Sequence, residues 1–168
     1  FREHIYEIFE EICGARLTTN IGRIGGLERD FNDIAFAKIN KFLIDYPIAL
    51  KEFESLLNRN RIFIDRTAGV AQVSQEDALS YGWTGPLLRA TGVDYDVRVS
   101  EPYSSYQDFD FEVPVGTSGD IYDRYLVRNE EMWQSLSIIK QALEKIKLEP
   151  DGVFHADVPA FYLPAKEE

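Results

Sequence analysis

The longest amphipathic pattern in this 168-residue chain runs from Asp120 to about Lys147. Its apolar residues recur at steps of three and four, as they do along one face of an α-helix. They are Tyr122, Tyr125, Leu126, Met132, Leu136, Ile139, Leu143 and Ile146. Gly119 suits the start of a helix, and Pro150 and Gly152 suit its end. The pattern therefore predicts one long helix whose apolar face must be covered by other helices.

The same periodicity marks two further helices nearer the start of the chain. One is predicted over residues 2–14, with Gly14 as its end signal. The second is predicted over residues 32–46, and its apolar stripe continues beyond Pro47 to Leu57. A proline inside a helix removes a hydrogen bond and clashes with the preceding turn. We therefore expect either a kink at Pro47 or two helices that meet there.

The middle of the chain is less regular. Residues 61–73 fit no single pattern, and Ser74 suits the N-cap of a short helix over residues 75–81. Residues 82–119 carry three prolines and five glycines, and a loop of this length is usually functional. Within it, the alternation of acidic and apolar residues over 108–115 favours a strand. Two or three short strands are expected to pair in this region.

These elements predict a mainly α fold, with a helical bundle core and a long irregular loop that carries two or three short β-strands. Residues 1–148 are expected to form a single helical domain, and residues 149–168 an extended tail that contains prolines. Near the start, Gly25 and Gly26 follow Arg23 and shape a turn at which a backbone can approach another chain closely.

Composition excludes several classes of function. The formal net charge of −11 argues against nucleic acid and against anionic lipid as partners. No apolar run approaches the roughly 18 residues of a membrane span. Cys13 is the only cysteine, and His4 and His155 are far apart, so no metal-ligand spacing is present. We expect no catalytic residue and no metal ligand in this chain, and an opening on Phe1 suggests a fragment or a processed chain.

Arginine is distributed unusually. Between residues 52 and 139 there are seven arginines and no lysine, which favours the planar, forked, partly buried pairing that lysine serves poorly. Acidic residues lie close by in the sequence. Two interpretations remain open: a structural ion-pair network that holds the loop on the long helix, or guanidinium groups that face a partner subunit or a ligand. The candidate residues for these roles are Arg23, Gly25, Gly26, Arg89, Asp94, Asp96, Arg98, Asp120, Asp123, Arg124 and Arg128.

An ordered set of motifs extends this interpretation. GARL and GRIGG near the start are followed by FIDRTAGV (63–70), DALSYGWTGPLLRATGVDYDVR (77–98), PYSSYQDFDFEVPVG (102–116) and GDIYDRYLVRNEEMWQSLSIIKQAL (119–143). In this order and spacing, they resemble the D subunit of bacterial NADH:quinone oxidoreductase, respiratory complex I. That family is related to the large subunit of nickel–iron hydrogenases, so the resemblance implies a hydrogenase-like helical bundle. It also implies that this chain is the central part of a longer subunit.

The resemblance implies a role as well. The parent complex passes electrons from NADH through FMN and iron–sulfur clusters to quinone and translocates protons. This segment would bind none of those cofactors, and it would scaffold the quinone chamber and the contacts between subunits. The implied partners are the small, cluster-bearing B subunit, the C subunit, the membrane-arm subunits, and quinone through the full-length subunit.

The resemblance further places the chain at the cytoplasmic face of the bacterial inner membrane, as a peripheral-arm subunit without a membrane span. The glycine pair after Arg23 would lie towards the B subunit. At Ile21, relatives often have tyrosine, so an aromatic contact at that turn is not expected here. The isolated chain should be inactive. Two alternatives remain: a non-catalytic interaction module, or a large-subunit fragment of a membrane-associated nickel–iron hydrogenase.

Overall fold

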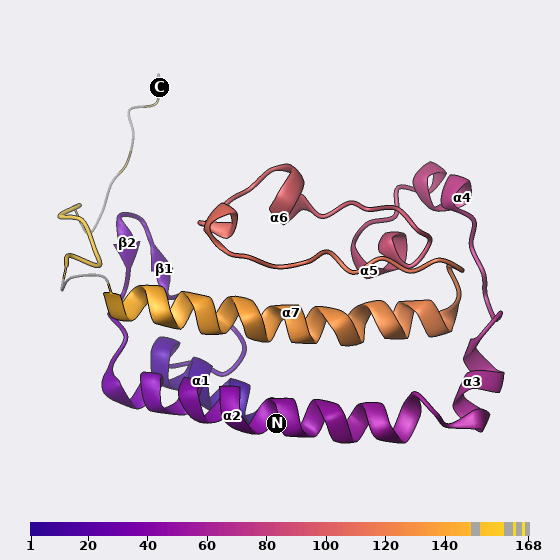
Figure 1. The fold of residues 1–168 in the computed structure, drawn as a ribbon. Coiled ribbons are helices and arrows are strands. Elements are labelled where there is room, and N and C mark those ends of the chain that lie inside the picture. Colours follow the sequence, from indigo (N-terminus) through magenta and orange to yellow (C-terminus); the bar gives the residue numbers. More distant parts are fainter. Residues whose placement is uncertain (149–151, 160–162, 164–165, 167–168) are drawn as a thin grey trace. The chain divides into compact units, whose positions relative to one another are not determined.

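The computed structural model describes residues 1–148, 152–159, 163 and 166. The chain forms two compact units, Phe1–Tyr46 with Lys147–Glu168 and Pro47–Ile146, and each is described by itself. The predicted mainly α class is confirmed (Figure 1). The predicted boundary between a helical domain and an extended tail at residue 149 stays a prediction, because residues 149–151 and most of 160–168 lie outside the described part.

The first unit contains a helix, a hairpin and the start of a long helix. Helix α1 (Arg2–Cys13) ends at Gly14 as predicted. Strands β1 (Gly22–Arg23) and β2 (Gly26–Leu27) pair as an antiparallel hairpin. Helix α2 (Asp33–Leu57) begins after Asn32, and Lys38 of α2 pairs with Glu11 of α1 at 2.9 Å.

The glycine turn of the hairpin is approached closely by the chain's own residues 154–156. The Leu27 amide donates to the Phe154 carbonyl at 2.9 Å, and the Ala156 amide donates to the Gly25 carbonyl at 2.9 Å. A Cβ at Gly26, where φ is 145°, would lie 2.4 Å from the Phe154 oxygen. Only glycine therefore fits at Gly26.

Helix α2 is continuous through Pro47, so the alternative of two separate helices is wrong. The apolar stripe explains the continuity, since Leu50, one turn beyond the proline, is 3% exposed. In the second unit, the last turns of α2 run antiparallel to α7 (Ile121–Leu148), the predicted long helix. Side-chain hydrogen bonds join Glu54 to Asn129 and Asn58 to Tyr125.

Short helices fill the rest of the second unit. They are α3 (Arg61–Thr67), α4 (Gln75–Ser80), α5 (Gly85–Arg89), α6 (Val97–Ser100) and the 3₁₀-helix η1 (Tyr106–Asp108). The Ser74 N-cap of α4 is confirmed, because its hydroxyl accepts from the Asp77 amide at 3.0 Å. The ambiguous stretch after Asn60 resolves into α3, whose first amides donate to the Asn60 side chain.

The strand predicted over residues 108–115, and the pairing of strands within the long loop, are wrong. The strands found in the described residues lie in the hairpin of the first unit. Residues 108–116, here called the strap, run along α7 (Figure 1). Gln141 of α7 accepts from the Asp110 amide and donates to the Asp110 carbonyl, and Gln134 accepts from the Glu112 amide. Side chains of α7 thus make hydrogen bonds to the strap backbone that a neighbouring strand would otherwise make.

Candidate functional site

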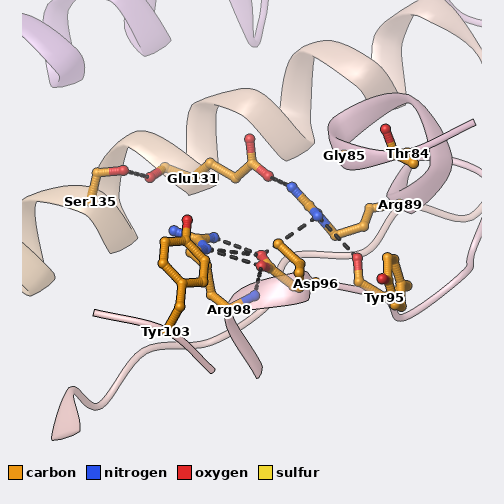
Figure 2. Close-up of a pocket in the computed structure, with 10 residues that line it drawn as sticks. Thr84, Gly85, Arg89, Tyr95, Asp96, Arg98, Tyr103, Glu131 and Ser135 are labelled. Atoms are coloured by element: carbon orange, nitrogen blue, oxygen red, sulfur yellow. Dashed lines mark hydrogen bonds and ion pairs between the residues drawn. The ribbon is translucent and has the colours of Figure 1, made fainter. Parts of the chain in front are cut away.

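Arg89 is the centre of a largely buried group of charges in the second unit. Helix α5 places it in its last turn, where it is 6% exposed. Its Nη1 donates to the Tyr95 carbonyl at 3.0 Å and lies 3.5 Å from Oδ2 of Asp96. Its Nη2 pairs with Oε1 of Glu131 on α7 (Figure 2). One guanidinium group therefore joins α5, the segment before α6, and α7.

Asp96 links this arginine to Arg98. As the N-cap of α6, Asp96 accepts from the Arg98 amide at 2.9 Å and from Nη2 of Arg98 at 2.7 Å. The hydrogen bond from the Arg98 side chain lowers the pKa of Asp96, against the effect of burial. In return, Asp96 raises the pKa of Arg98. The Arg98 guanidinium also lies 4.9 Å from the ring centre of Phe111 in the strap.

Arg89, Asp96, Arg98 and Glu131 form what we call the balanced cluster, because two cations face two carboxylates. The cluster lines a cleft of about 630 Å³ whose other walls include Tyr103 (Figure 2). Every charged group in it already has an ionic partner. The cluster therefore fastens the loop to α7.

The predicted residues at the start of α7 act as clamps of a different kind. Asp120 accepts from the Gly69 amide at 2.7 Å and caps α7 by accepting from the Asp123 amide at 2.8 Å. Asp123 accepts from the Thr117 amide at 2.8 Å. Arg124 donates to the carbonyls of Ala71 and Gly119, at 2.7 and 2.8 Å, rather than to Asp120. Charged side chains here bind the backbone of the segment after α3 and of the segment that leads into α7.

The remaining predicted residues lie apart from the cluster. Arg128 is exposed and donates to the Arg124 carbonyl at 3.0 Å. Asp94 is exposed and makes no ion pair within the described residues. Arg23 lies in the first unit, where it pairs with Glu28 at 3.0 Å, and Gly25 and Gly26 form the turn described above.

Sequence reasoning missed Glu131, which supplies the second carboxylate of the balanced cluster. It lies 42 residues beyond Arg89, and no local spacing signals a pair so distant. The two glutamines that hold the strap were missed for the same reason. A glutamine on a helix surface is ordinarily expected to face solvent. Whether its side chain instead bonds to the backbone of a neighbouring segment, as another strand would, depends on the packing of the whole unit.

A second hollow, of about 590 Å³, lies between α2, α7 and the end of the strap; we call it the acidic pocket. Its walls include the carboxylates of Glu54, Asp123 and Glu130, and neither lysine nor arginine contributes to them. Glu54 accepts from Nδ2 of Asn129 at 2.6 Å and from Nε1 of Trp133 at 2.7 Å. Asn129 also borders a neighbouring apolar groove.

The side chains and helices of the described residues bear on metal and membrane chemistry. No group of three or more His, Cys, Asp and Glu side chains among them is placed to hold a metal ion. Cys13 is a single thiol, whereas iron–sulfur clusters take several cysteine ligands, so these residues do not fit a cluster. Among the described helices, none combines the length and apolar content required to cross a membrane.

Comparison with known proteins adds an independent observation. The family model described as "Respiratory-chain NADH dehydrogenase, 49 Kd subunit" matches residues 1–168. The second NADH-quinone oxidoreductase D subunit of Cytophaga hutchinsonii is 72% identical over 167 residues, which are 99% of this chain and 42% of the relative. The D subunit of Flavobacterium psychrophilum is 66% identical, and that of Myxococcus xanthus 49%; each alignment covers all of this chain and 40% of the relative. The chain thus spans about two fifths of the length of these curated relatives.

Proposed function

Because the chain belongs to the family of the 49-kDa subunit of respiratory-chain NADH dehydrogenase, we propose that it is the central part of the quinone-site subunit of a proton-translocating NADH:quinone oxidoreductase. That complex would pass electrons from NADH through FMN and iron–sulfur clusters to quinone. The names of the relatives, which are D subunits of NADH-quinone oxidoreductase, support this assignment. Since the matched family is a respiratory one, we favour it over a hydrogenase.

Within the complex, this segment scaffolds the quinone chamber and the contacts between subunits. The balanced cluster is the observation that carries this part of the proposal. Arg89 and Asp96 are 7% and 4% exposed in their side chains, and each charge has a partner inside the segment. Breaking a buried ion pair is strongly destabilising, so such a network holds one arrangement of α5, α6 and α7. A fixed framework is what a chamber built by neighbouring segments requires.

The proposed partners are the B subunit, the C subunit and the membrane-arm subunits, with quinone bound through the full-length subunit at the cytoplasmic face of the bacterial inner membrane. The hairpin supports a protein contact, because Ile24 at its tip is 85% exposed and stands beside Arg23. Exposed apolar residues next to an arginine are common in protein interfaces. We propose that the cofactors of the complex are held by other segments and subunits.

Affinity purification tests the assignment. The full-length chain, tagged in its native cells, should co-purify with NADH:quinone reductase activity and with bound flavin and iron. The full-length chain produced alone should show no such activity. A stable native assembly that contains the chain but lacks NADH:quinone reductase activity would refute the assignment, and activity from the chain alone would refute the scaffold role.

The hairpin contact has its own test. In the full-length subunit, Arg23→Ala should weaken capture of the B subunit, whereas Lys51→Ala, on an exposed part of α2, should leave it unchanged. Equal capture of the B subunit by both variants would show that Arg23 does not contribute to the interface.

A further inference from the structure

A groove with mainly apolar walls lies in the second unit where α2, α3, α5 and α7 meet; we call it the apolar groove. Its volume is about 890 Å³, larger than that of the cleft beside the balanced cluster. Phe53 and Ile121 on its walls are 41% and 37% exposed, and the side chains of Phe63, Tyr125 and Met132 beside them are half-buried. Apolar surface gathered in this way is stabilised when another apolar group removes it from water.

The walls of the groove also carry positive charge. Arg124 and Arg128 lie one turn apart on α7, and both line the groove. Arg124 donates to backbone carbonyls, exposed Arg128 donates to the Arg124 carbonyl, and neither forms an ion pair within the described residues. The carboxylate of Glu131, on the same walls, is already engaged by buried Arg89. An occupant with a carboxylate at Arg128 would therefore match the groove in both polarity and charge.

The elements around the groove favour a helix as its occupant. Strands β1 and β2 belong to the first unit, so no described strand edge borders the groove to which an extended segment could add. A helix bonds its own backbone and presents an apolar stripe, which suits a groove between packed helices. The occupant that fits is therefore an amphipathic helix with a carboxylate beside its apolar face.

The relatives indicate where such a helix comes from. The alignments cover 42% of the Cytophaga subunit and 40% of the Flavobacterium subunit, so more than half of each relative lies outside the aligned part. The helices that supply most of the groove walls, α2 and α7, also carry core residues such as Leu50 and Val127, each 3% exposed. A segment of the same polypeptide reaches this surface at a high effective concentration, whereas a separate protein must be recruited.

We propose that an amphipathic helix of the full-length subunit, from outside residues 1–168, docks in the apolar groove and places a carboxylate against Arg128. This inference rests on the proposed function, because it requires that the chain is part of a longer subunit. The docked helix extends the packing of α2 and α7 and removes Phe53 and Ile121 from water.

Site-specific photo-cross-linking in the assembled native complex is the test. Benzoylphenylalanine replaces Phe53 in the full-length subunit, and irradiation joins its ketone carbon to a neighbouring carbon, whose hydrogen moves to the ketone oxygen. Mass spectrometry should find the probe joined to a peptide of the same subunit from outside residues 1–168, in a product that migrates as a single subunit on a denaturing gel. The same replacement at Tyr81, an aromatic residue that is 78% exposed and does not line the groove, should not capture that peptide.

The charge match gives a second readout. Arg128→Glu should reduce the yield of the Phe53 cross-link at least about fivefold, a difference of roughly 1 kcal/mol in docking. Replacing the facing carboxylate of the captured helix with lysine should restore the yield in that variant. Lys140→Glu, the same charge reversal at an exposed position further along α7, should leave the yield unchanged.

The outcomes separate this inference from the proposed function. If the complex retains NADH:quinone reductase activity, capture of another subunit, of a lipid or of a second copy, or the absence of any adduct, would overturn the inference and leave the proposed function standing. Capture of the same-subunit helix in an assembly without that activity would refute the proposed function instead. Equal yields from Arg128→Glu and Lys140→Glu would overturn the contact between the carboxylate and Arg128.

Discussion

Glu130 and Glu131 are neighbours on α7, yet their surroundings differ completely. Glu131 pairs with buried Arg89, whereas Glu130 lies in a pocket without a cation. Successive residues on a helix point about 100° apart, so each carboxylate meets a different part of the chain. The balanced cluster contains both signs of charge, whereas the walls of the acidic pocket carry only carboxylates. Two carboxylates one residue apart on a helix therefore serve in different surroundings: one joins a buried ion-pair network, and the other borders a pocket without a cation.

The largest expected effect comes from removing the centre of the balanced cluster. Arg89→Ala leaves Asp96 and Glu131 partly or wholly buried without their shared cation. The free energy of unfolding should fall by about 3–5 kcal/mol, measured by denaturant titration. Exposed Arg61→Ala is the matched control, and it should change the free energy of unfolding by less than about 1 kcal/mol. Equal effects of the two variants would show that the cluster contributes no more than a surface pair.

Asp96→Asn should have the next largest effect and a characteristic pH dependence. Arg98 lowers the pKa of Asp96 in the folded chain, so the charged pair stabilises the fold above the ordinary aspartate pKa of about 3.9. That contribution is lost as the pH falls through the lowered pKa. The variant should lose about 2 kcal/mol of unfolding free energy at pH 7 and progressively less below about pH 4. A difference from wild type that stays constant between pH 7 and pH 3 would contradict the charged pair.

The strap provides a smaller effect. Gln141→Leu removes the hydrogen bonds to both the amide and the carbonyl of Asp110. Because these groups are exposed, water replaces part of the loss, and the free energy of unfolding should fall by about 1 kcal/mol. Hydrogen exchange at the Asp110 amide should accelerate. Gln75→Leu, at an exposed position of α4, should alter neither the free energy of unfolding nor the exchange rate at Asp110. Unchanged exchange at Asp110 in Gln141→Leu would show that this glutamine does not hold the strap.

The smallest effect belongs to the acidic pocket. Glu54→Gln should change the free energy of unfolding of the isolated chain by less than about 1 kcal/mol. The glutamine oxygen still accepts from Asn129 and Trp133, and no ion pair is lost in the described residues. A loss above about 2 kcal/mol would mean that Glu54 has a cationic partner inside the chain and that the contrast between the two regions is false.

The sequence predicted elements whose signal is local. The long helix is predicted from Asp120 to about Lys147 and observed as Ile121–Leu148, because its apolar periodicity extends over many turns. The Ser74 cap was predicted because its signal lies within three residues. The excess of arginine left two interpretations open, and the pairing of Arg89 with Glu131 agrees with one of them, an ion-pair network that holds the loop on the long helix.

The features that the sequence could not predict depend on contacts between distant residues. Acidic and apolar alternation over the strap is typical of a strand, but strand formation needs a second strand, and α7 occupies that side with Gln134 and Gln141. The identity of the carboxylate that pairs with Arg89 has no local signal either. The acidic pocket was not predicted, because it forms only when α2, α7 and the strap come together.

Turnover per assembled complex is the most direct test of the scaffold role. Arg89→Lys should be placed in the full-length subunit, and both the amount of assembled complex and its NADH:quinone reductase rate should be measured. If the balanced cluster is structural, the amount of assembled complex falls, because lysine cannot reach Tyr95, Asp96 and Glu131 together, while the rate per assembled complex stays within about twofold of wild type. Assembly at the wild-type level with turnover lost would contradict the account and place Arg89 in the reaction itself.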